Sequence, residues 1–170
     1  MSLIEHRRSA PDCVKVMVLT VSDTRDEHTD RSGQLMMRLL QSAGHIITRY
    51  QIVKDEQDVI QQELSAGLED REVDAIISNG GTGIAYRDVT IETIKGLLDK
   101  EMPGFGEIFR MLSYQEDIGS AAILSRAIAG VTQGKVIFAT PGSTGAVELA
   151  MNKLILPELA HVVRELKKDL

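Results

Sequence analysis

The feature that most constrains the fold of this chain is the alternation of short apolar runs with segments of helical periodicity. The run VKVMVLTVS at residues 14–22 is almost continuously apolar, which is typical of a strand covered on both faces. A helical pattern follows at 30–45, with Gly44 as its stop signal. Because strand, helix and strand in succession favour a right-handed crossover, the alternation predicts parallel strands between helix layers.

The alternation continues along the chain and changes only near its end. Further elements are predicted, strand and helix in turn, at 46–53, 55–70, 73–78 and 88–99. At 125–142 two β-like runs are separated by the turn TQG, which predicts an antiparallel hairpin at a sheet edge. The helical pattern from 144 onward should be kinked or interrupted by Pro157. The expected fold is therefore α/β, a three-layer α/β/α sandwich with a mostly parallel sheet and an antiparallel edge hairpin.

Length and composition favour one globular domain and argue against several classes of function. With 170 residues, 43% of them hydrophobic, the chain can bury one core, so we predict a single domain at 14–170 after a flexible segment at 1–13. The net charge of −6 argues against a nucleic-acid-binding protein. No stretch approaches the ~20 apolar residues of a membrane span, which predicts a cytoplasmic protein with no membrane partner. One cysteine and four scattered histidines predict neither a disulfide nor a zinc framework.

Three of the predicted strands end in turns rich in small and polar residues. These turns are SDT at 22–24, SNGGTG at 78–83 and TPGSTGA at 140–146. In α/β sheets ligands bind beyond the carboxyl ends of the strands, and glycine-rich turns let backbone N–H groups approach an anion. Neither glycine-rich turn matches the P-loop or the dinucleotide-binding pattern. Together they predict a site for a ligand with more than one phosphate, although a tight connection with positive φ would explain either turn alone.

Acidic residues occur at the same strand ends. Asp23, Asp55 and Asp88 each follow a different predicted strand, and Glu107 follows the predicted glycine turn PGFGE. Carboxylates beside a polyphosphate are favourable only with a cation between them, and Mg²⁺ bridges carboxylates to phosphates. For Asp55 and Asp88 the alternative is helix capping, since both begin helical patterns. The residues that could supply positive charge to phosphates, unless they are ordinary surface residues, are Arg87, Arg126 and Lys153.

Four segments follow one another in a specific order after TVSDTR and DRSG. They are SNGGTGIAYRDVTIET, MPGFGEIFR, AILSRAIAGV and TPGSTGAVELAMNKLILPEL. In this order they resemble the molybdopterin-binding domain of the MoaB/MogA family, from about Val14 to the C-terminus. The resemblance implies a three-layer α/β fold and a nucleotidyltransferase in molybdenum cofactor biosynthesis, which converts Mg-ATP and molybdopterin into adenylylated molybdopterin and pyrophosphate. It also implies homotrimers or homohexamers, with the molybdenum insertase of the pathway as a candidate protein partner.

The resemblance assigns roles to individual residues. Asp55, in VKDEQ, and Asp88, after Arg87, correspond to the catalytic acids of the family and are expected to hold Mg²⁺ on the phosphates of ATP. The residues expected to bind the two substrates are Ser22, Asp23, Asn79, Gly80, Gly81, Thr82, Gly83, Arg87, Glu107, Ser125, Arg126, Pro141, Gly142 and Ser143. The NGGTG loop is expected to hold one phosphate through its backbone. The PGST turn resembles the MoaB branch, and a non-catalytic molybdopterin carrier or assembly partner is the alternative function.

Overall fold

The computed structural model describes residues 13–169, and a six-stranded sheet lies at its centre. The strands are β1 (Lys15–Val21), β2 (Ile46–Val53), β3 (Ala75–Asn79), β4 (Lys100–Glu101), β5 (Ile128–Thr132) and β6 (Lys135–Thr140). They lie in the order β2-β1-β3-β6-β5-β4, in which the first three pairs are parallel and the last two antiparallel. The predicted sheet is therefore confirmed, while the segment expected to be flexible lies, except for Cys13, outside the described residues.

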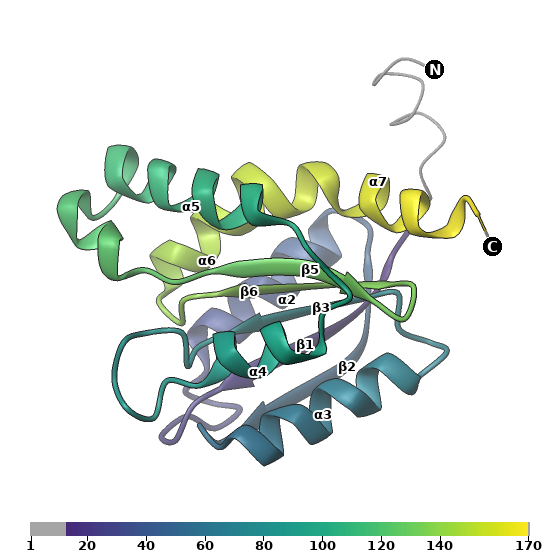
Figure 1. Cartoon of the computed structure of the whole chain (residues 1–170), viewed down its shortest axis with the longest axis horizontal. Coiled ribbons are helices and arrows are strands. Elements are labelled where there is room, and N and C mark those ends of the chain that lie inside the picture. Colours follow the sequence, from purple (N-terminus) through teal and green to yellow (C-terminus); the bar gives the residue numbers. More distant parts are fainter. Residues whose placement is uncertain (1–12, 170) are drawn as a thin grey trace.

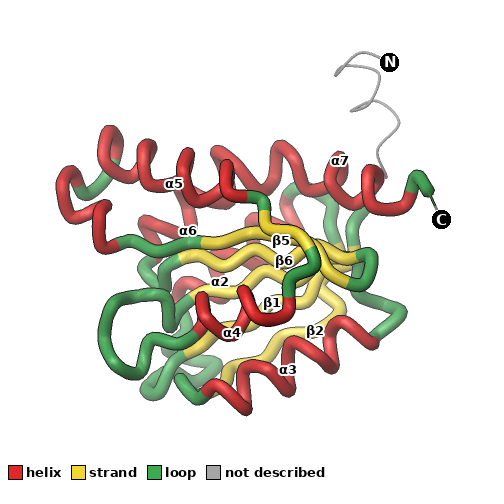
Figure 2. The backbone as a smooth tube through the Cα atoms, in the orientation of Figure 1, coloured by secondary structure: helices red, strands yellow, loops and turns green. Residues whose placement is uncertain are grey.

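Helices cover both faces of the sheet (Figure 1). One face carries α2 (Arg31–Ser42), α5 (Pro103–Glu116), α6 (Thr144–Ala150) and α7 (Leu156–Lys167). The other face carries α3 (Gln57–Glu69) and α4 (Thr90–Leu97). Figure 2 shows the strands as the middle layer between these two sets of helices. The three-layer arrangement predicted from the alternating pattern is confirmed.

Strand β1 explains why its sequence is apolar at nearly every position. Val16 and Val18 are fully buried in the core beneath α2, α5, α6 and α7. Met17 and Leu19, with which they alternate, are fully buried in the core beneath α3 and α4. Because successive side chains of a strand point to opposite faces, a strand between two helix layers needs apolar residues on both.

The β5–β6 hairpin has the turn that its sequence predicts. Gln133 and Gly134 both have positive φ, 50° and 71°. Two consecutive residues with positive φ are the signature of the two-residue type I′ turn, whose twist matches that of the strands it joins. With the short strand β4, which pairs with β5, the hairpin forms the antiparallel edge of the sheet, as expected.

The prediction of a glycine turn at PGFGE before Glu107 is wrong. Helix α5 begins at Pro103, so both glycines of this segment lie in its first turns. Proline suits the first position of a helix, because its φ is already helical and the missing N–H has no partner there. Gly106 serves close packing, since a Cβ at this position would lie 2.8 Å from the carbonyl oxygen of Ala127.

The C-terminal helical pattern is interrupted near Pro157, as predicted, and the interruption is a short π-helical segment. This segment, η2 (Met151–Ile155), lies between α6 and α7. At its end the N–H of Leu156 donates to the carbonyl of Met151, five residues earlier. Pro157 follows at once, and proline has no N–H and crowds the carbonyl four residues before it. The wide turn therefore precedes the position where a regular helix would be disturbed.

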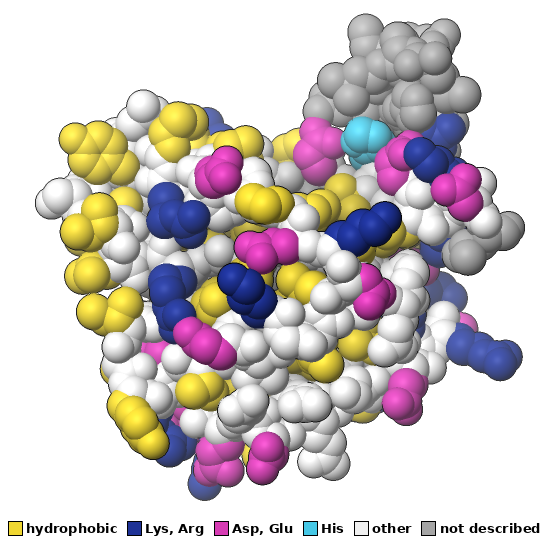
Figure 3. Space-filling model, viewed as in Figure 1, with side chains coloured by type: hydrophobic (Ala, Val, Ile, Leu, Met, Phe, Trp, Pro, Cys, Tyr) yellow, Lys and Arg dark blue, Asp and Glu magenta, His cyan; other side chains and the backbone are white. Residues whose placement is uncertain are grey.

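Apolar side chains gather on the surface over α5 and the 3₁₀ helix η1 (Gly119–Leu124), on the left of the view in Figure 3. The residues concerned, each between 45% and 82% exposed, are Ile108, Met111, Tyr114, Ile118, Ile123 and Leu124. Large exposed apolar surfaces of this kind are uncommon on monomers. Within residues 13–169, no helix has the length and apolar character needed to cross a membrane.

Candidate functional site

A cavity of about 380 Å³ opens beyond the carboxyl ends of β1, β3 and β6. Its lining residues are Val21, Ser22, Arg25, Asp55, Gly80, Gly81, Thr82, Gly83, Asp88, Leu124, Ser125, Pro141 and Gly142. Loops that are far apart in the sequence therefore meet at one rim of the sheet, where α/β folds bind their ligands. Ten of the predicted site residues belong to this lining.

The loop after β3, residues 80–83, begins with two residues in the left-handed region, which favours glycine. Gly80 and Gly81 have φ values of 92° and 65°. A Cβ on Gly80 would collide with the carbonyl oxygen of Val21, so the loop packs directly on the end of β1. The N–H of Gly80 donates to the carbonyl of Thr140 at 3.1 Å, which joins the loop to the end of β6.

The next three backbone N–H groups of this loop are available to a ligand. Among residues 13–169 no acceptor is found for the N–H groups of Gly81, Thr82 and Gly83. Unpaired backbone donors in a glycine-rich turn form concave sites for anions, because the amide dipoles converge where no side chain intervenes. The predicted contact between this loop and a phosphate is consistent with that geometry and stays a prediction.

Two carboxylates lie against the loop. A Cβ on Gly81 would be 2.8 Å from Oδ1 of Asp55, and one on Gly83 would be 2.6 Å from Oδ2 of Asp88. Neither acid caps a helix: the N-cap of α3 is Glu56, that of α4 is Val89, and neither has a side-chain cap hydrogen bond. The capping explanation for Asp55 and Asp88 is therefore wrong. Asp88 instead accepts the N–H of Ala85 at 2.9 Å and closes the turn before α4.

The negative charge of Asp55 is incompletely balanced by its surroundings. Burial, followed by the nearby negative charges of Asp23 and Asp88, raises the pKa of Asp55. The buried hydroxyl of Thr90, next to the Gly81 backbone, has no hydrogen-bond partner in the described part of the chain. A cation between the carboxylates would relieve the charge and give these oxygens a partner.

The donor set fits Mg²⁺ shared with a phosphate ligand. Residues 13–169 contain no group of three or more His, Cys, Asp or Glu side chains arranged to hold a metal ion. Mg²⁺ is commonly bound by one or two carboxylates, with water and phosphate oxygens completing its coordination. Asp55 and Asp88 would hold the ion, which would neutralise charge on the phosphates of a bound nucleotide.

Asp23 and Arg87 form an ion pair outside the lining of the cavity. Nε and Nη2 of Arg87 donate to the two carboxylate oxygens of Asp23 at 2.6 and 2.9 Å. This hydrogen bonding holds the pKa of Asp23 below its usual value. Oδ1 of Asp23 also accepts the backbone N–H of Asp55 at 3.2 Å. The pair therefore positions the backbone of Asp55, and its predicted substrate contacts stay predictions.

Arg126 binds the glycine loop through its carbonyl groups. Its Nε donates to the carbonyl of Thr82 at 3.0 Å, and its Nη2 to the carbonyl of Gly83 at 2.7 Å. The guanidinium also forms an ion pair with Glu92, which lowers the pKa of that carboxyl. In a trans peptide the N–H points away from the carbonyl of the same unit, so the contact with the Thr82 carbonyl turns the N–H of Gly83 away from Arg126.

Three other predicted site residues are absent from the lining. Glu107 is exposed on α5. The hydroxyl of Ser143 caps α6 by accepting the N–H of Ala146 at 3.2 Å. Asn79 is fully buried, and its side chain belongs to the polar network described next. Their predicted substrate contacts stay predictions.

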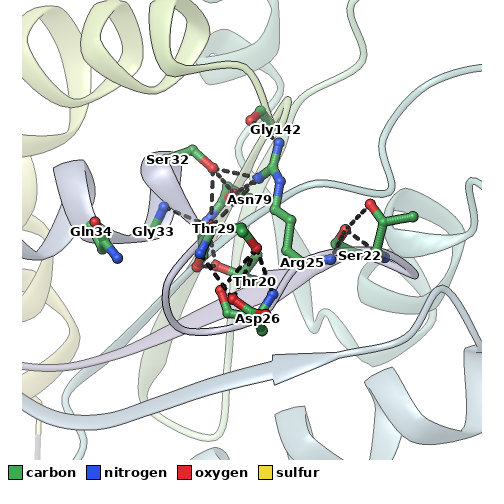
Figure 4. A network of polar contacts seen from close by, with 12 residues as sticks. Thr20, Ser22, Arg25, Asp26, Thr29, Ser32, Gly33, Gln34, Asn79 and Gly142 are labelled. Carbon is green, nitrogen blue, oxygen red and sulfur yellow. Dashed lines mark hydrogen bonds and ion pairs between the residues drawn. The ribbon is translucent and has the colours of Figure 1, made fainter.

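A buried polar network joins the segments that carry the loops (Figure 4). At its centre Asp30, fully buried at the start of α2, accepts hydrogen bonds from Thr20 at 2.6 Å and from Tyr50 at 2.7 Å. Burial, followed by this bond to Asp30, raises the pKa of Tyr50. Asn79 donates to Thr20 at 3.0 Å and accepts from Ser32 at 2.8 Å. The carboxyl ends of β1 and β3 are thereby tied to the start of α2.

Arg25 joins this network to the cavity and was not among the predicted site residues. Its Nη1 donates to Ser32 at 2.6 Å and to Asn79 at 3.4 Å, and its Nη2 to the carbonyl of Gly142 at 2.8 Å (Figure 4). Nη1 also lies 3.5 Å from the carboxylate of Asp30. One guanidinium thus links the loops after β1, β3 and β6. The sequence feature that could have identified Arg25 is its place in TVSDTR, just after the first strand.

The chain is similar to known proteins over nearly its whole length. Residues 17–161 match a family described as "Probable molybdopterin binding domain". The chain is 64% identical over 169 residues to the molybdenum cofactor biosynthesis protein B of Bacillus subtilis (strain 168), covering 99% of both chains. A crystal structure of a molybdenum cofactor biosynthesis protein B, 59% identical, superposes with a TM-score of 0.90 over 93% of this chain and 98% of the other. The tungsten cofactor synthesizing protein MoaB from Pyrococcus furiosus, 38% identical, gives a TM-score of 0.80 over 94% and 100%.

Proposed function

This chain belongs to the MoaB/MogA family of molybdopterin-binding proteins, and from that premise we propose that it catalyses the Mg-ATP-dependent adenylylation of molybdopterin. A phosphate oxygen of molybdopterin attacks the α-phosphorus of ATP, and the bond from that phosphorus to the β-phosphate oxygen breaks. The products are adenylylated molybdopterin and pyrophosphate. The observation that carries the proposal is that Asp55 and Asp88 lie against the same glycine loop within one cavity.

The chemistry requires a site that brings two anions together and neutralises their charge. Asp55 and Asp88 hold Mg²⁺, which reduces the negative charge of the triphosphate when it is bound. The N–H groups of residues 81–83 bind one phosphate group, and Arg126 supports the loop by its bonds to the carbonyls of Thr82 and Gly83. Asp23 and Arg87 keep Asp55 in place through its backbone.

The exposed apolar surface over α5 and η1 supports an assembly of several copies, either a homotrimer or a homohexamer. In a closed symmetric assembly every copy of such a surface is buried against another subunit, so no further subunit can be added. Light scattering coupled to size-exclusion chromatography would measure the mass of the assembly. A monomer at micromolar concentration would contradict this part of the proposal.

The test mixes the full chain with Mg-ATP and molybdopterin under anaerobic conditions and measures adenylylated molybdopterin and pyrophosphate by chromatography. The double variant Asp55→Asn, Asp88→Asn should lower turnover by about 100-fold or more, because it removes both ligands that hold the metal. Asp58→Asn, an exposed acid on α3, is the matched control and should leave turnover unchanged. Unchanged turnover in the double variant would show that the two acids are structural.

The alternative function is a non-catalytic molybdopterin carrier or assembly partner. A carrier would use the same cavity and bind molybdopterin without releasing pyrophosphate. Binding of molybdopterin with no adenylylated product, at saturating Mg-ATP, would favour the carrier over the enzyme. Absence of binding by either ligand would reject both functions.

A further inference from the structure

The charged residues of the cavity are divided between its two sides. Three charged side chains line it: Arg25, Asp55 and Asp88. The two carboxylates lie against Gly81 and Gly83. The guanidinium of Arg25 bonds to Gly142 instead, on the side where Gly142 packs against Gly80. The cavity therefore has an acidic side suited to a metal-bound ligand and a basic side formed by one arginine.

Arg25 keeps donor capacity for a ligand although it is already anchored. A guanidinium has five N–H donors, and its bonds to Ser32, Asn79 and Gly142 leave Nε–H and one N–H of Nη2 without an acceptor in residues 13–169. The nearest carboxylate, that of Asp30, also accepts from Thr20, Tyr50 and the N–H of Gly33, so its charge is shared among several donors. The side chain is 29% exposed, which leaves it accessible from the cavity.

The two substrates of the proposed reaction differ in the partner that they need. ATP arrives with Mg²⁺ and suits the carboxylates, whereas a phosphate without a metal is repelled by them. On the premise of the function proposed above, we propose that Arg25 binds the metal-free phosphate group of molybdopterin. Its guanidinium holds that group on the Gly80–Gly142 side of the cavity, because planar N–H donors match phosphate oxygens in pairs. The attacking oxygen and the metal-bound triphosphate are thereby kept on opposite sides until they react.

The test measures binding of each substrate separately, by calorimetry or fluorescence, to the full chain and to variants. Arg25→Gln should raise the Kd for molybdopterin about tenfold or more, since it removes a charge-assisted contact, and leave the Kd for Mg-ATP within about twofold. Asp55→Asn should do the reverse. Inorganic phosphate should compete with molybdopterin on the unmodified chain and lose this effect in Arg25→Gln. Arg38→Gln, an exposed arginine on α2, is the matched control and should behave like the unmodified chain.

Arg25→Lys addresses a structural role for the side chain. Lysine keeps the charge but not the paired donors, so its Kd for molybdopterin should fall between those of the unmodified chain and Arg25→Gln. Equal weakening of molybdopterin and Mg-ATP in both variants would mean that Arg25 only maintains the loops, and would overturn the proposal. Unchanged molybdopterin binding in Arg25→Gln, while the unmodified chain still forms adenylylated product, would overturn this assignment alone. Absence of molybdopterin binding to the unmodified chain would overturn the proposed function as well.

Discussion

Replacing Gly80 with alanine tests the close approach between the glycine loop and the end of β1. At this position φ is 92°, and a Cβ would contact the carbonyl oxygen of Val21 well inside the 3.0 Å that separates real Cβ atoms from their neighbours. An alanine at positive φ costs about 1–2 kcal/mol, and forced overpacking adds about 1–3 kcal/mol. Gly80→Ala should therefore lower the free energy of unfolding by about 2–5 kcal/mol.

Gly44 is the matched control, because its φ of 87° is similar but no atom lies within 4 Å of its Cβ position. Gly44→Ala should lower the free energy of unfolding by only about 1–2 kcal/mol. Urea unfolding followed by far-UV circular dichroism measures both variants, which suits a chain without tryptophan. Gly80→Ala should also weaken Mg-ATP binding. Equal destabilisation by the two substitutions would refute the role assigned to the Val21 carbonyl.

Two further substitutions probe the charge and the support of the loop. Burial and the charge of Asp23 raise the folded pKa of Asp55 above its ordinary value of 3.8, so the ionised carboxylate destabilises the fold at neutral pH. This penalty begins to shrink as pH falls through the folded pKa and is gone below the ordinary value. Asp55→Asn should therefore have a higher Tm than the unmodified chain at neutral pH, and thermal melts should show this difference in Tm shrinking as pH falls. A difference in Tm that grows in acid would contradict a raised pKa of Asp55. Arg126→Ala should destabilise the fold by about 1–3 kcal/mol and accelerate amide hydrogen exchange in the loop, whereas Lys95→Ala, which removes an exposed ion pair, should change stability by less than about 0.5 kcal/mol. Unaltered exchange in Arg126→Ala would show that the arginine does not hold the loop.

The sheet could be predicted because strand patterns are local to the chain, and the meeting of the strand-end loops could be predicted because it follows from parallel topology. A strand buried on both faces must be apolar at successive positions, as Val16 and Met17 show. Parallel strands must then bring their carboxyl ends to one rim, which is why Asp55, Asp88 and the glycine loop meet although no local signal connects them.

The parts that could not be predicted depend on contacts between distant segments. Arg25 bonds to a carbonyl 117 residues further along the chain. The sequence around it does not distinguish such an arginine from an ordinary surface arginine in a polar turn. The capping alternative for Asp55 and Asp88 failed for a similar reason. An aspartate before a helix is a good cap by type, and only the backbone geometry shows that Glu56 and Val89 hold the cap positions instead.

The π-helical segment before Pro157 has a consequence for how the length of this chain can vary. Buried residues recur every four positions through it, at Val147, Met151, Ile155, Leu159 and Val163. A regular α-helix turns by about 100° per residue, so one additional residue would rotate the buried face of α7 away from the sheet. The wide turn absorbs that residue. Deletion of one residue within this turn would therefore leave a regular α-helix with α7 still on the sheet, provided that Pro157 is also replaced, whereas a deletion elsewhere in the helix would rotate α7 away.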